Sequence, residues 1–93
     1  MRCKVYKRTT KIVNPTGLHA RPASEFIKAA AKFDSYIGIR KSGSESEANA
    51  KSIVFLLSLG LSQGTEVELS AEGEDEKAAV DTLVELLESG FGE

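Results

Sequence analysis

The apolar residues change their spacing several times within 93 residues, and this constrains the fold more than any other feature of the chain. Where every second residue is apolar, as at Val67 and Leu69, the pattern is typical of a half-buried strand. Where apolar residues recur three and four positions apart, as at Ala23, Phe26 and Ala30, it is typical of a helix on a core. The alternation predicts strands and helices that share one core.

These patterns predict seven elements in the order β-α-β-β-α-β-α. The strands are expected at residues 4–13, 35–41, 46–50 and 65–71, with the third one weak. The helices are expected at residues 20–32, 53–58 and 75–89. Pro22 fits a first helical turn, and Glu74, Asp75 and Glu76 suit the positive end of the last helix. We therefore expect a single two-layer α+β domain over residues 1–93, with three helices on one face of a four-stranded sheet and polar side chains on the other.

The charge and composition exclude several classes of partner. The net charge is −2 without a long basic run, and aromatic residues make up only 6% of the chain, with no tryptophan. A small α+β nucleic-acid-binding domain, which needs a basic sheet face with stacking aromatics, is therefore the least favoured alternative. The longest apolar run, residues 53–57, is too short to span a bilayer, and residues 1–8 do not resemble a secretory signal. With its single cysteine, Cys3, the chain is expected to be cytoplasmic, without membrane insertion.

The only histidine, His19, lies where the turn "NPTG" gives way to the first predicted helix. A helix start attracts anions, because its first N–H groups have no partner and the helix dipole is positive there. The same field keeps an imidazole neutral, with a lone pair that can attack phosphorus. The conformational freedom of Gly17 favours the turn, and Leu18 can anchor it by packing inward. Arg21 can pair with phosphoryl oxygens, while the backbone N–H groups of Ala20 and Arg21 bind the same phosphoryl group.

No further catalytic group accompanies this histidine. The chain shows no carboxylate pair, Ser/His/Asp set, phosphate-binding glycine loop or metal-ligand cluster. We therefore expect no metal, no cofactor and no stand-alone enzyme, but a relay for phosphoryl groups that depends on the catalysis of its partners.

Three stretches of the sequence resemble the HPr family of histidine-containing phosphocarriers. They are "GLHARPA" at residues 17–23, "AKSIVFLLSLGLSQG" at residues 50–64 and "SAEGEDEKAA" at residues 70–79. The resemblance implies an open-faced sandwich with a four-stranded antiparallel sheet. It also implies that His19, assisted by Arg21, accepts a phosphoryl group from enzyme I, which phosphoenolpyruvate phosphorylates. The group then passes to sugar-specific A domains of the phosphotransferase system.

Ser52 falls where the family carries a regulatory serine that an ATP-dependent kinase modifies in many bacteria. In other bacteria the serine is present without such a kinase, so the resemblance implies a serine kinase/phosphorylase and a carbon-catabolite regulator as further partners only where the kinase exists. The position of Ser52 before the helix at 53–58 also predicts an N-cap, whose hydroxyl accepts a hydrogen bond from a first-turn N–H. The two roles are compatible.

The helix at residues 53–58 is apolar on every side, so it cannot bury all of its surface in its own core. The resemblance places Ile53, Val54 and Leu57 outward as docking contacts for partners and Leu56 inward. Ser24 and Lys28 of the first helix belong to the same expected docking surface. The alternative is that loops cover these apolar residues. Phe55 departs from the family, which is often smaller or polar at this position.

Two further functions stay open. One is a regulatory binding module that acts through phosphorylated Ser52 on a transcription factor, although the presence of His19 argues against this as the sole role. The other is a phosphocarrier of a parallel, nitrogen-related chain. A monomer is expected in each case.

Overall fold

The strands form one antiparallel sheet in the order β1-β4-β2-β3, so that the first strand pairs with the last. The computed structural model describes residues 5–18, 20–45 and 47–92. In the centre of the sheet, β4 pairs with β1 through Thr10 and Val67 and with β2 through Ile39 and Leu69. The strands are β1 (Tyr6–Lys11), β2 (Tyr36–Lys41), β3 (Glu47–Asn49) and β4 (Glu66–Glu72).

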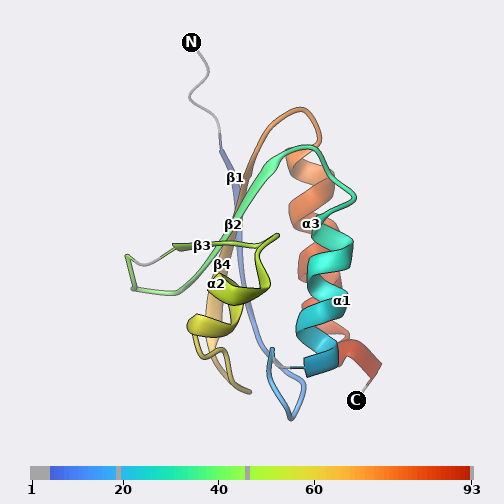
Figure 1. Cartoon of the computed structure of the whole chain (residues 1–93). Coiled ribbons are helices and arrows are strands. Elements are labelled where there is room, and N and C mark those ends of the chain that lie inside the picture. The colour runs from blue at the N-terminus through green and yellow to red at the C-terminus, as the bar shows by residue number, and fades with distance from the viewer. Residues whose placement is uncertain (1–4, 19, 46, 93) are drawn as a thin grey trace.

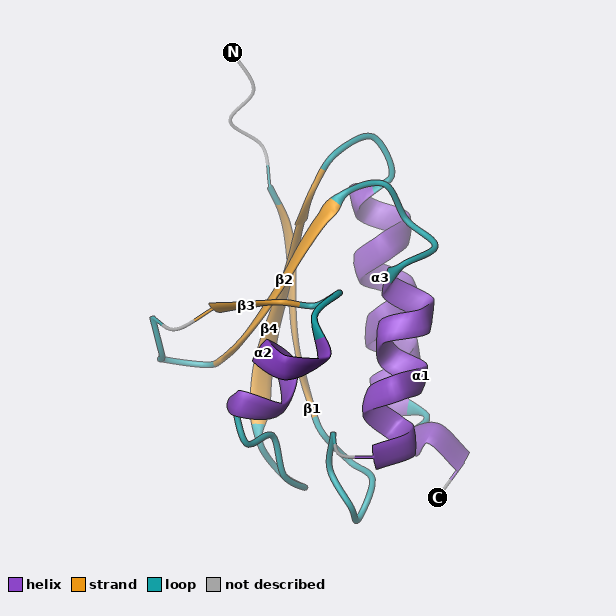
Figure 2. Cartoon of the chain, viewed as in Figure 1, coloured by secondary structure: helices purple, strands orange, loops and turns teal. Residues whose placement is uncertain are grey.

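The helices lie on one face of this sheet. Figures 1 and 2 show α1 and α3 side by side along it, and α2 packs against α1 and β3. The bounds are α1 (Ala20–Ala30), α2 (Ile53–Ser58) and α3 (Glu76–Glu88), followed by a short 3₁₀ turn, η1 (Gly90–Gly92). The predicted element order and the open-faced α+β sandwich are confirmed. Within the described ranges, no helix is long and apolar enough to cross a membrane.

The core lies between the sheet and the helices, and the two apolar periods converge on it. Val67, Leu69 and Ala71 alternate along β4 and are buried, as are Ala23 and Phe26 on α1. The buried residues of α3 complete it: Ala79, Val80, Leu83, Val84 and Leu87. The fold thus follows from burying one face of the sheet against one stripe of each long helix.

The open face of the sheet is polar, as predicted. Lys7, Lys11 and Glu66 are exposed there. Glu68 is half-buried because the guanidinium of Arg40 pairs with it, with Nη2 2.7 Å from Oε1. This ion pair joins the neighbouring strands β2 and β4.

Two predicted elements end two residues earlier than predicted. β1 ends at Lys11 rather than at residue 13, because the backbone of Ile12 pairs with Gly64 and Thr65 in a connecting segment instead of a regular strand. α1 ends at Ala30 rather than at residue 32, because the Lys32 N–H bonds to the carbonyl three residues earlier and tightens the last turn.

Asp75 lies at the start of α3, as predicted, and has a further role. It precedes α3, but its carboxylate makes no cap hydrogen bond to that helix. Instead it accepts hydrogen bonds from the Ser35 hydroxyl and from the backbone N–H groups of Asp34 and Ser35, at 2.9 and 3.0 Å for the two N–H groups. The Ser35 hydroxyl is the main cause that lowers the pKa of Asp75 below its ordinary value, followed by the Asp34 N–H. Asp75 therefore ties the start of α3 to the α1–β2 loop.

We expect Asp75→Asn to weaken the fold at neutral pH much more than at acid pH. Because the folded state lowers the pKa of Asp75 below 3.8, its ionised carboxylate stabilises the fold above that pH. This contribution disappears as the pH falls through the lowered value, so the two proteins should converge there. Urea unfolding between neutral pH and about pH 2.5 measures the difference, with Glu74→Gln as a neighbouring control. A constant difference at every pH would contradict this role.

Candidate functional site

The loop before α1 is held in a single shape by its own hydrogen bonds. The buried side chain of Asn14 donates to the Gly17 carbonyl at 2.7 Å, and the Gly17 N–H donates to the Asn14 carbonyl at 3.1 Å. Gly17 adopts a φ of +70°, which glycine favours, as the turn prediction required. The loop therefore delivers the chain to the start of α1 in a fixed direction.

The α2–β4 connection holds this loop from the other side. The Leu18 N–H donates to the Leu61 carbonyl at 2.8 Å, and the side chain of Gln63 donates to the Val13 carbonyl at 3.1 Å. Leu18 and Leu61 are both buried, so Leu18 anchors the loop as predicted. Segments more than 40 residues apart in the sequence are thus joined next to the candidate site.

The start of α1 carries the predicted phosphoryl site. His19 lies outside the described residues, as does the side chain of Ala20, while the backbone is helical from Ala20 onward. The first turn of α1 contains no acidic residue. A helix start with only a basic side chain, Arg21, favours an anion more than an ordinary helix start does.

Arg21 is exposed, and its guanidinium pairs with Glu25. Nη1 donates to Oε2 at 2.6 Å, one turn further along the helix, and 59% of the Arg21 side chain and 38% of the Glu25 side chain are exposed. In this structure the guanidinium is therefore engaged by a carboxylate, with which phosphoryl oxygens would compete. Further along α1, Ser24 is half-buried and Lys28 is exposed.

Helix α2 presents apolar side chains to solvent. Val54 is 71% exposed, Phe55 60% and Leu57 40%, whereas Leu56 is buried in the core as predicted. The side chain of Ile53 lies outside the described residues. No loop in the described part of the chain covers Val54 or Phe55. α2 ends before Gly60, whose φ of +63° agrees with the predicted left-handed stop.

Ser52 is the N-cap residue of α2, but the predicted hydroxyl cap is wrong. Its backbone is extended, with φ −115° and ψ 114°, and its side chain makes no cap hydrogen bond. Its carbonyl accepts the Leu56 N–H at 2.9 Å. Because the following residues Val54 and Phe55 are exposed, water can satisfy the first-turn N–H groups in place of the hydroxyl.

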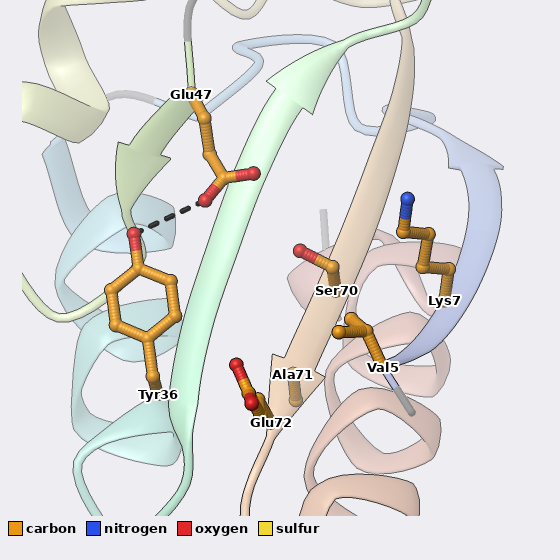
Figure 3. Close-up of a pocket in the computed structure, with 7 residues that line it drawn as sticks. All are labelled: Val5, Lys7, Tyr36, Glu47, Ser70, Ala71 and Glu72. Atoms are coloured by element: carbon orange, nitrogen blue, oxygen red, sulfur yellow. Dashed lines mark hydrogen bonds between the residues drawn. The ribbon is translucent and has the colours of Figure 1, made fainter. Parts of the chain in front are cut away.

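A shallow hollow of about 240 Å³ lies on the open face of the sheet, away from the helices (Figure 3). The Tyr36 hydroxyl at its edge donates to Glu47 at 3.1 Å, and burial, then this hydrogen bond, raises the pKa of Tyr36. None of its lining residues belongs to the predicted site. They are Val5, Lys7, Tyr36, Glu47, Ser70, Ala71 and Glu72. Residues 5–18, 20–45 and 47–92 contain no cluster of His, Cys, Asp and Glu suited to a metal ion.

Sequence reasoning missed three residues that shape the site. Asn14 and Leu61 hold the loop through bonds to backbone groups, and no local pattern reveals that Leu61 reaches Leu18. Glu25 had a visible signal, because it follows Arg21 by four residues and such pairs meet on one helix face.

Comparisons with known proteins agree with this fold and site. The model of the family described as the PTS HPr component phosphorylation site matches residues 6–89. The phosphocarrier protein HPr of Buchnera aphidicola from Acyrthosiphon pisum is 48% identical over 79 residues, which cover 85% of this chain and 91% of that protein.

Two solved structures from Thermoanaerobacter tengcongensis are also similar. HPr-C-His has a TM-score of 0.90 and 52% identity, with 95% of this chain and 97% of that one covered. An HPr dimer has a TM-score of 0.75 and 54% identity, with 90% and 94% covered.

The open-faced sandwich, with its basic, acid-free helix start beside an apolar helix, fits the class of small phosphoryl carriers. With the family match over most of its length, the chain belongs to the HPr family of phosphocarriers of the phosphotransferase system.

Gly17→Ala tests how firmly the loop is held. A Cβ at Gly17 would clash with the Leu61 carbonyl oxygen, a backbone group that cannot easily move. Gly43 also has a positive φ, +84°, but open space around it, so it is a matched control. We expect Gly43→Ala to lower the free energy of unfolding by about 1 kcal/mol, and Gly17→Ala by at least about 2 kcal/mol more. Equal losses in chemical denaturation would mean that the loop adjusts freely.

Proposed function

We propose that this chain accepts a phosphoryl group on His19 from phosphorylated enzyme I and passes it to sugar-specific A domains. In each transfer, a neutral imidazole lone pair forms a bond to phosphorus while the bond to the donor's nitrogen breaks. The chain then becomes the donor in the next step. Partners supply the remaining catalysis, so the protein is a carrier rather than a stand-alone enzyme.

The exposed Arg21 in an acid-free first turn is the observation that supports this proposal most strongly. Arg21 follows an anchored loop, and the first-turn N–H groups of α1 favour an anion. Arg21 offers a planar fork of donors to phosphoryl oxygens. The backbone of Ala20 and Arg21 is proposed to cradle the same group.

The exposed residues of α2 support a role in docking. We propose that Val54 and Leu57, with Ile53, Ser24 and Lys28, contact enzyme I and the A domains. Apolar side chains this exposed are typical of binding surfaces, and α2 packs against α1, which carries the phosphoryl site. Phosphorylation of Ser52 would add about −2 charges beside this surface and alter docking to partners such as a catabolite regulator.

The cellular setting is proposed on the same grounds. Donor and acceptor proteins of a phosphotransferase chain meet in the cytoplasm, and we place this chain there. A monomer suffices for the proposed transfer, because one chain supplies both α1 and α2. The monomer remains a prediction, since one solved relative is an HPr dimer.

The test is incubation with phosphoenolpyruvate and a cognate enzyme I. We expect one acid-labile, base-stable phosphate per chain, and none in His19→Ala. Arg21→Ala should slow the transfer about tenfold or more, because phosphoryl oxygens lose a charged donor. Its free energy of unfolding should change by about 0.5 kcal/mol or less, because the arginine is exposed. Labelling of His19→Ala at the wild-type level would refute the proposal.

Val54→Glu tests the docking surface. A charge buried at the partner interface should raise the KM of enzyme I for this chain about tenfold or more. The stability of the free chain should not change, because Val54 is 71% exposed. Val5→Glu is the matched control, since Val5 is 42% exposed but lies on the open face of the sheet. An unchanged KM in Val54→Glu would remove α2 from the docking surface.

A further inference from the structure

We infer that Glu25 is a positioning residue for the transfer, which holds Arg21 while the carrier is empty and releases it when the phosphoryl group arrives. This inference rests on the proposed function of His19 and Arg21. It is carried by the ion pair of 2.6 Å between Arg21 Nη1 and Glu25 Oε2. Glu25 would thereby set how strongly the carrier retains its phosphoryl group.

Arg21 has Glu25 as its partner in the structure and the phosphoryl group as its partner in the proposed function. Residues 21 and 25 share one face of α1, so the guanidinium reaches Glu25 along the helix. The proposed phosphoryl site belongs to the start of the same helix, before Arg21 in the sequence. The first turn contains no acidic residue, so Glu25 supplies the carboxylate that engages Arg21 from the second turn.

The difference in charge decides which partner Arg21 prefers. A phosphoryl group carries between about −1.5 and −2 charges and three acceptor oxygens, whereas Glu25 carries −1 and two oxygens. The phosphoryl group therefore attracts the guanidinium more strongly. Both side chains are substantially exposed, so the ion pair between Arg21 and Glu25 is weak. Breaking this pair therefore costs too little free energy to prevent Arg21 from binding the phosphoryl group.

The exchange of partners makes the phosphoryl group easier to pass on. Breaking the pair with Glu25 offsets part of the stabilisation that Arg21 gives to the phosphorylated form. A carrier needs this balance, because a group held too tightly would not reach the next acceptor. Glu25 thus favours transfer over retention.

The experiment is a double-mutant cycle with wild type, Glu25→Gln, Arg21→Ala and the double variant. Each protein is equilibrated with enzyme I at a fixed ratio of phosphoenolpyruvate to pyruvate, and the phosphorylated fraction is measured. Glu25→Gln should shift the equilibrium toward the phosphorylated carrier about twofold, the strength of an exposed i,i+4 pair. The shift should largely vanish without Arg21 and at about 1 M salt.

Two controls separate positioning from simple charge or folding effects. Glu74→Gln removes the same charge from the turn before α3. This turn lies near the end of α1 that is remote from its first turn (Figure 1), so the equilibrium should be unchanged. Glu25→Asp keeps the charge and should stay closer to wild type than Glu25→Gln does. All variants should unfold at nearly the same denaturant concentration.

The outcomes distinguish this inference from the proposed function. If wild type is labelled at His19 but Glu25→Gln leaves the equilibrium unchanged, Glu25 has no positioning role and the proposed function stands. An equal shift with and without Arg21 would also overturn the inference, because the carboxylate would then act directly. If His19→Ala is labelled like wild type, both proposals fall together.

Discussion

The hydrogen bonds between the loop before α1 and the α2–β4 connection support the whole candidate site. Leu18 and Leu61 are joined through their backbones and are both buried, while Asn14 fixes the turn between them and β1. Buried backbone groups need partners, so these bonds cannot be given up without cost. The start of α1 is therefore held by the fold rather than by its own short loop.

This arrangement places two kinds of surface next to each other. The start of α1 offers the positive charge of Arg21 and first-turn N–H groups, which suit an anion. Helix α2 packs against α1 and offers exposed Val54 and Phe55. A partner that docks on the apolar surface can thus present a phosphoryl group to the polar one. Affinity and chemistry are separated but adjacent, which is the basic requirement for a carrier used by several proteins.

Much of the fold was predictable because the spacing of apolar residues along the chain indicates whether a segment is a strand or a helix. The stripe through Ala23 and Phe26 gave α1, and the alternation of Val67 and Leu69 gave β4, both with bounds within two residues. Side-chain partners were harder to predict, because they depend on tertiary contacts. Asp75 binds the α1–β2 loop, and Arg21 pairs with Glu25. The sequence thus indicated where the site begins, but not what holds its side chains.

The strand order has a consequence for synthesis on the ribosome. β1 occupies a sheet edge whose only neighbour is β4, about 60 residues later in the chain, and the loop after β1 needs Leu61. Such distant pairings form late, because a long loop must first close. A nascent chain that ends before β4 therefore lacks the scaffold of the phosphoryl site. The loop before α1 thus reaches its final shape only when most of the chain has emerged.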